Sequence, residues 1–147
     1  MRTTRMTPFS TSIAAVLLGR LPFALRDQTP RLIVAFDGDD TRPLLPLDPF
    51  AFSGESQVSC TLLGGPIRDF NLIYSPQRYH ARLQWVDGVQ RFFSTAQTVL
   101  VFSVADEVKV LEQVLGQHDC LQVDGNNGLL DISVTGRCCI IELTPRG

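Results

Sequence analysis

The residues best suited to chemistry follow a Gly-Gly-Pro sequence in the middle of the chain. They are Arg68, Asp69, Phe70 and Asn71. On a strand, Asp69 and Asn71 face one side while Arg68 and Phe70 face the other, because successive side chains alternate. An arginine can hold a carboxylate through two parallel hydrogen bonds. If the chain binds a small ligand, we expect these four residues to form the site, with Arg68 holding a ligand carboxylate.

A structural role competes with this interpretation. Short polar side chains beside Gly-Pro commonly bond to the backbone of a turn, so we slightly favour Asp69 and Asn71 as turn anchors. We expect the aromatic side chains of Phe50, Phe52, Phe70 and Trp85 in the core rather than around a ligand.

The sequence offers no strong metal or catalytic pattern. A metal site needs three or four converging ligands, and the only two histidines, His80 and His118, lie far apart in the sequence. We expect His80 on the polar face of a strand and His118 in a turn, where it caps local backbone. There is no Gly-x-Ser-x-Gly elbow and no phosphate-binding glycine loop. We therefore expect no catalytic residue, no metal and no cofactor.

The four cysteines have none of the spacings of a zinc or redox motif. Cys60 and Cys120 are isolated, and Cys138–Cys139 are adjacent, so that on a strand they point to opposite faces. We expect all four to be small hydrophobic side chains in a reduced cytosolic protein.

The composition and the net charge of the chain exclude some classes of protein. The chain has 147 residues, 44% of them hydrophobic, and a net charge of −2. Because Lys109 is the only lysine and the arginines form no run, we expect no nucleic-acid binding.

Arg2 and Arg5 precede the apolar stretch Ile13–Leu18 as in a short signal peptide, but no cleavage site follows. No stretch approaches the ~20 apolar residues of a membrane span. We interpret Ile13–Leu18 as a buried strand and expect a cytoplasmic protein without a membrane segment.

Strand signals dominate the chain. The run Leu32–Phe36 reads as a buried strand before a turn at Asp37–Asp40, and Val58–Leu63 alternates as in a half-buried strand. Pro43, Pro46 and Pro49 predict a rigid extended connection without regular structure. The residues on either side of Asp87–Gly88 alternate, which predicts a type I′ β-hairpin over Tyr79–Phe93.

Further strands are expected towards the C-terminus. Val99–Val104 reads as a buried strand. Asp106–Leu115 fits either a helix that ends at Gly116 or two short strands, and the neighbouring strands favour the second. The remaining strands are expected at Leu121–Val123, Leu129–Val134 and Cys139–Leu143. Many short strands separated by turns predict an all-β antiparallel sandwich or barrel.

Two motifs carry a resemblance to a known family. Pro49–Gly54 reads PFAFSG, and Gly65–Asn71 reads GPIRDFN. At this separation they resemble the PFxFxG turn and the GPxRDFN sequence of the HutD/Ves family of small cupin-like β proteins. The resemblance covers about Leu44–Leu143 well and the first 43 residues poorly.

The resemblance implies two cupin-like barrels in one chain. The second would span residues 65–147, and the first, over residues 1–64, would be shortened. Thr7–Ser10 resembles a trace of an upstream family element, whereas the Trp- and Arg-rich segment that family members carry before it is missing. A shortened barrel leaves a strand edge unpaired, so we expect a homodimer formed through that edge.

The resemblance also implies a function. HutD-like proteins are associated with histidine catabolism, so we expect a non-enzymatic protein that binds or senses a small carboxylate intermediate, urocanate or formylglutamate, in a barrel cavity. A metal-independent cupin-type isomerase or lyase is the first alternative, and it requires His80 and a carboxylate in one cavity. An interaction or scaffold protein that has lost ligand binding is the second.

Overall fold

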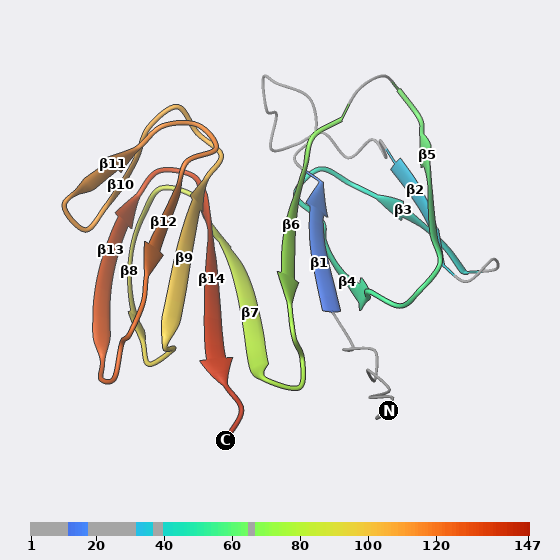
Figure 1. The fold of residues 1–147 in the computed structure, drawn as a ribbon. Helices are drawn as coiled ribbons and strands as arrows, with labels where there is room; N and C mark the ends of the chain where they lie inside the picture. The colour runs from blue at the N-terminus through green and yellow to red at the C-terminus, as the bar shows by residue number, and fades with distance from the viewer. Residues whose placement is uncertain (1–11, 18–31, 37–39, 65–66) are drawn as a thin grey trace, which may run out of the picture. The chain divides into compact units, whose positions relative to one another are not determined.

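The chain is an antiparallel all-β protein. The computed structural model describes residues 12–17, 32–36, 40–64 and 67–147. These residues form fourteen strands and no helix, and thus no helix long and apolar enough to cross a membrane (Figure 1). The strand pairs are antiparallel. The predicted fold class is therefore confirmed.

Contacts divide the chain into two compact units, Met1–Pro76 and Gln77–Gly147. The boundary lies further along the chain than the expected one after residue 64. The reason is strand β6 (Asp69–Tyr74), which pairs along its whole length with β1 (Ser12–Leu17) and so belongs to the first unit.

The described part of the first unit consists of two three-stranded sheets. One has the order β4-β1-β6, and the other has the order β3-β2-β5. The remaining strands of these sheets are β2 (Leu32–Phe36), β3 (Asp40–Leu44), β4 (Pro49–Ser53) and β5 (Val58–Leu62). The strands predicted around residues 13, 32 and 58 are thus present. The positions Thr7–Ser10 and Asp37–Asp39 lie outside the described residues.

The prediction that three prolines exclude regular structure was wrong. Pro43 lies within β3 and Pro49 opens β4, and each strand is at the edge of its sheet. Proline is tolerated at such positions because its missing N–H need not join a ladder. Only Pro46 lies in a turn, in which the Asp48 N–H donates to the Leu45 carbonyl at 3.1 Å.

The second unit is an eight-stranded jelly roll. Its two sheets have the orders β12-β9-β14-β7 and β11-β10-β13-β8, and most connections pass from one sheet to the other. The strands are β7 (Tyr79–Val86), β8 (Val89–Ser94), β9 (Thr98–Ser103), β10 (Val108–Val110), β11 (Gln113–Leu115), β12 (Cys120–Val123), β13 (Leu130–Thr135) and β14 (Cys138–Pro145).

The ambiguous segment 106–115 forms two short strands, as predicted. Val108 and Val110 are buried while Lys109 between them is exposed, which is the two-residue period of a strand. Leu111 has a positive φ of 52° in the tight turn that leads into β11.

The prediction of a β-hairpin at Asp87–Gly88 was wrong. Its two strands exist, but β7 pairs with β14 and β8 pairs with β13, in different sheets. A type I′ turn needs positive φ at both central residues, and only Gly88 has one. Gly88 instead exchanges two backbone hydrogen bonds, of 3.2 and 2.9 Å, with Gly136. Both chain segments therefore bend together at these glycines and pass from one sheet to the other.

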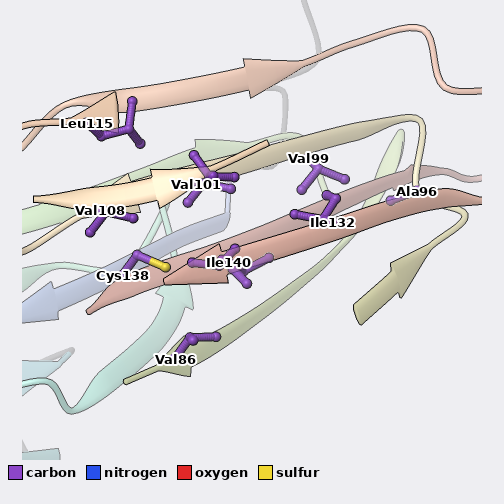
Figure 2. Close-up of a cluster of buried hydrophobic side chains, with 11 residues drawn as sticks. Val86, Ala96, Val99, Val101, Val108, Leu115, Ile132, Cys138 and Ile140 are labelled. Carbon is purple, nitrogen blue, oxygen red and sulfur yellow. The ribbon is translucent and has the colours of Figure 1, made fainter. Parts of the chain in front are cut away.

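Aliphatic side chains fill the interior of the second unit. Alternate residues of several strands are directed to one side and are almost fully buried, among them Val99, Val101, Ile132, Val134 and Ile140. Figure 2 shows side chains of this cluster gathered between the strands. Since these positions are occupied by packed hydrocarbon, they form the hydrophobic core of the second unit.

Candidate functional site

The first unit contains a cavity of about 290 Å³. Residues from both of its sheets line it, so the cavity lies within this unit. Most of the wall is apolar and consists of Val34, Leu44, Val58, Leu62 and Ile67, together with two phenylalanines. A concave, largely apolar site with few polar groups is typical of small-molecule binding sites.

Strand alternation explains which side chains reach the cavity. Alternate residues of β5, which are Val58, Cys60 and Leu62, belong to the wall. Val58 is 38% exposed and Leu62 is 53% exposed, so the strand predicted to be half-buried is more open than expected. The difference arises because these side chains face a cavity rather than a filled core.

Two phenylalanines form an aromatic wall. Phe50 and Phe52 are alternate residues of β4, and their rings stack with centroids 5.9 Å apart at an angle of 26°. The guanidinium group of Arg42 lies 4.8 Å from the centroid of the Phe50 ring and forms an ion pair of 3.2 Å with Asp48. Phe50 packs against the buried core residues Val34 and Leu44, as expected of a core residue. Both phenylalanines also line the cavity, which was not expected. Their alternation in the PFAFSG motif was the available signal.

One part of the cavity wall is polar. Asp69 and Asn71, alternate residues of β6, both line the cavity. The Asn71 side-chain amide donates a hydrogen bond of 2.8 Å to one carboxylate oxygen of Asp69. The turn at Gly65–Pro66, which the structural interpretation has these side chains anchor, lies outside the described residues. The other carboxylate oxygen of Asp69 remains as an acceptor at the cavity.

The other two predicted site residues are placed differently. Arg68 is exposed and Phe70 is half-buried, and neither belongs to the cavity wall. The strand period accounts for this division, since residues 69 and 71 face the cavity. None of the described residues that line the cavity is an arginine.

The two histidines are in the second unit. His80 is exposed on β7, as predicted. His118 lies in the predicted turn with a positive φ of 68°, and its ring stacks on Phe102 with centroids 6.1 Å apart. The side chain that caps this turn is that of Asp119, which accepts a hydrogen bond of 2.8 Å from the Gly116 N–H. Within the described residues, no three His, Cys, Asp or Glu side chains are grouped to hold a metal ion.

The cysteines fall into two classes. Cys138 and Cys139 are fully buried, as expected for small hydrophobic side chains, whereas Cys60 and Cys120 are exposed. Burial raises the pKa of the Cys138 thiol to about 11 and that of Cys139 to about 12.

We expect iodoacetamide at pH 8 to modify Cys60 and Cys120 in the native protein and to spare Cys138 and Cys139. The thiolate is the reactive form, and a raised pKa and burial both suppress its reaction. Intact-mass spectrometry counts the adducts, two in native protein and four after unfolding in urea. A Cys60→Ser, Cys120→Ser double variant is the control and gains none while folded. Rapid native labelling of all four thiols would contradict the buried placement of the pair.

Comparison with known proteins assigns the family. The HutD family model matches residues 20–140. A Pseudomonas putida protein described as an uncharacterized 21.2 kDa protein in the hutC 3′ region is 56% identical over 132 residues, which cover 86% of this chain and 68% of that protein.

Solved structures agree with this assignment. The structure of HutD from Pseudomonas fluorescens SBW25 has a TM-score of 0.81 and 69% identity, covering 93% of this chain and 70% of that one. A conserved protein of unknown function from Pseudomonas aeruginosa PAO1 has a TM-score of 0.78 and 36% identity, covering 93% and 74%. The expected cupin-like fold is confirmed. The chain belongs to the HutD family.

Proposed function

We propose that this chain is a non-enzymatic protein of histidine utilisation that binds a small carboxylate intermediate, urocanate or formylglutamate, in the cavity of its first unit. The observation that carries the proposal is the cavity itself, which is open, mostly apolar and polar only at a few side chains. Ligand sites commonly measure about 300–1,000 Å³, and a cavity at the lower end of this range suits a small metabolite.

The link to histidine utilisation comes from relatives. The Pseudomonas putida protein is named for its position in the hutC 3′ region, and the Pseudomonas fluorescens structure is named HutD. Both are similar to this chain over most of its length, which supports a function in the same metabolic context.

The chemistry of the wall supports binding rather than catalysis. Of the described residues that line the cavity, Asp69 and Cys60 carry an ionisable side chain and the others do not. General acid and base catalysis requires two groups positioned on either side of a proton transfer. His80, which the enzyme alternative requires in a cavity, is exposed on β7 and does not line this one. The guanidinium group of Arg42 packs on the ring of the wall residue Phe50, and we propose that it attracts a ligand carboxylate.

We expect urocanate or formylglutamate to raise the melting temperature of the purified protein. A ligand that binds only the native state stabilises it by about 2.7 kcal/mol at a hundredfold excess over Kd, which a thermal-shift assay detects. Phe52→Ala removes part of the aromatic wall and is expected to abolish the shift. Phe93→Ala is the matched control, because Phe93 is 57% exposed on β8 in the second unit.

Two outcomes of the thermal-shift assay would count against the proposal. A well-folded protein whose melting temperature does not change with either compound at millimolar concentration would contradict it. An equal shift in wild type and the Phe52→Ala variant would place binding elsewhere.

A further inference from the structure

We propose that strand β8 of the second unit pairs antiparallel with β8 of a second copy of this chain, so that two copies join edge to edge in a two-fold symmetric dimer. This surface lies outside the candidate site, and the inference does not depend on the proposed function. Strand β8 is at the edge of the sheet β11-β10-β13-β8, and among the described strands it pairs with β13 alone (Figure 1).

The backbone of β8 presents hydrogen-bonding groups at this open edge. In an antiparallel ladder, pairs of residues that exchange two hydrogen bonds alternate with pairs that exchange none. Gly88 and Gly136 exchange both bonds, so the next residue, Val89, exchanges none with β13. By the same alternation, the N–H and C=O groups of Val89, Arg91 and Phe93 are directed away from β13. Such a row of outward groups is a template for another strand.

A hydrogen bond on the other side of β13 agrees with this alternation. Ser133 is opposite Arg91 in the register, and its carbonyl oxygen accepts from the Leu111 N–H at 3.3 Å. Leu111 follows β10, the neighbour of β13 on the side away from β8. The Ser133 carbonyl is therefore directed away from Arg91.

The side chains of β8 favour association. Val89 is 83% exposed and Phe93 is 57% exposed, and they alternate with Phe92, which packs against the core. Edge strands are commonly protected by proline, by lysine or by a bulge, and β8 has none of these. The other edge strands of the second unit are less suitable. Strands β11 and β12 are short, and β7 contains no exposed large apolar residue.

The sequence of β8 is complementary to itself in one antiparallel register. A two-fold axis at Phe92 brings Arg91 of each copy opposite Phe93 of the other. The outward backbone groups of these residues then pair, and each guanidinium lies beside an aromatic ring, which is a favourable cation–π arrangement. The Phe92 side chains meet at the axis, and aromatic cross-strand pairs stabilise a sheet. An axis at Arg91 would instead place two like charges directly opposite each other, which is unfavourable.

The charge of Arg91 is balanced within each copy. The carboxylate of Asp131 accepts a hydrogen bond of 2.8 Å from Nε of Arg91 and forms an ion pair with Nη2. The same guanidinium group lies 5.5 Å from the centroid of the Phe93 ring. A second copy that approaches this edge therefore meets an ion pair and an aromatic ring rather than an uncompensated positive charge.

The test is sedimentation velocity of the purified full chain at concentrations from micromolar to millimolar. We expect a reversible equilibrium between monomer and dimer, because an interface built mainly from two edge strands is small and small interfaces are transient. Phe93→Lys places a lysine opposite Arg91 at both symmetric positions and is expected to raise the dimer Kd at least about tenfold. Val114→Lys is the matched control, because Val114 is 63% exposed on β11, at the opposite edge of the same sheet. It should leave the Kd unchanged.

Hydrogen exchange followed by NMR locates the interface. The amides of Arg91 and Phe93 should exchange rapidly in dilute protein and become protected as the concentration rises. The amides of Gln90 and Phe92, which the alternation directs to β13, should be protected at every concentration. Phe93→Pro removes an outward N–H without removing a bond to β13, so this variant should keep its fold and lose the dimer.

Three results would overturn the inference. One is a sedimentation coefficient that remains that of a monomer up to millimolar concentration. Another is a dimer that Phe93→Lys weakens no more than Val114→Lys does. The third is a dimer in which the Arg91 and Phe93 amides stay unprotected, since its interface would then lie elsewhere, as at the edge of the first unit that the sequence suggested. Ligand binding at the candidate site is measured separately, so none of these results decides the proposed function.

Discussion

Replacing Gly136 with alanine is expected to lower the free energy of unfolding of the second unit by about 3–5 kcal/mol. Gly136 has a φ of +122°, a conformation that residues with a Cβ rarely adopt. An added Cβ would lie 2.8 Å from the carbonyl oxygen of Glu107 and 3.0 Å from a methyl carbon of Val108. The first contact is with backbone, which cannot move aside as a flexible side chain can. The free-energy cost of the strained φ and the cost of the steric overlap therefore add.

Two other glycines separate these contributions. Gly88 has a φ of +96° but nothing within 4 Å of an added Cβ, so Gly88→Ala should cost only the conformational strain, about 1–3 kcal/mol. Gly128 is free of neighbours and has no positive φ, so Gly128→Ala should change stability by less than about 0.5 kcal/mol. Urea denaturation followed by the fluorescence of Trp85, the single tryptophan and a residue of β7, reports on the second unit. Equal losses for Gly136→Ala and Gly88→Ala would show that the close contact is absent.

Replacing Ile140 with alanine is expected to destabilise the second unit by about 3–4 kcal/mol. Ile140 is fully buried on β14, which lies between β9 and β7, and it is part of the hydrophobic cluster that fills the interior. The substitution removes apolar surface from the core and leaves a cavity that surrounding strands can fill only partly, because their ladders hold them in place.

A graded series tests this expectation. Ile140→Val removes one methylene group and should cost about 0.5–1.5 kcal/mol. Val89→Ala removes apolar atoms from a side chain that is 83% exposed on β8 and should cost less than about 0.5 kcal/mol. The same Trp85 fluorescence assay applies. A loss at Ile140 no larger than that at Val89 would mean that the interior of the second unit is not tightly packed.

Local patterns predicted the strands well. The alternating segment Val58–Leu63 and the apolar run Leu32–Phe36 were expected to be strands. The structure has strands at Val58–Leu62 and Leu32–Phe36, with nearly the expected bounds. The segment 106–115 was also predicted correctly as strands, although a helical spacing was present, because its neighbours are strands. Such signals depend on side chains a few residues apart, and the sequence contains this information directly.

Pairing between strands was predicted less well. Asp87–Gly88 has the composition of a hairpin turn, yet the strands on its two sides pair with β13 and β14, which are remote in the sequence. The ion pair between Arg137 and Asp87, at 3.2 Å, joins the two bends where these segments cross from sheet to sheet. No local signal distinguishes such a bend from a hairpin, because the difference lies in which distant strand supplies the hydrogen bonds.

The candidate site also combines features that local sequence patterns predict with features that depend on long-range strand pairing. The sequence by itself determined the all-β class, the family motifs and the alternation that places Asp69 and Asn71 on one face of a strand. Only the tertiary structure decided that this face borders a cavity, that Phe50 and Phe52 share its wall, and that Arg68 does not. The physical reason is that a cavity is formed by strands remote in sequence, whose packing depends on long-range pairing, whereas alternation is a property of each strand alone.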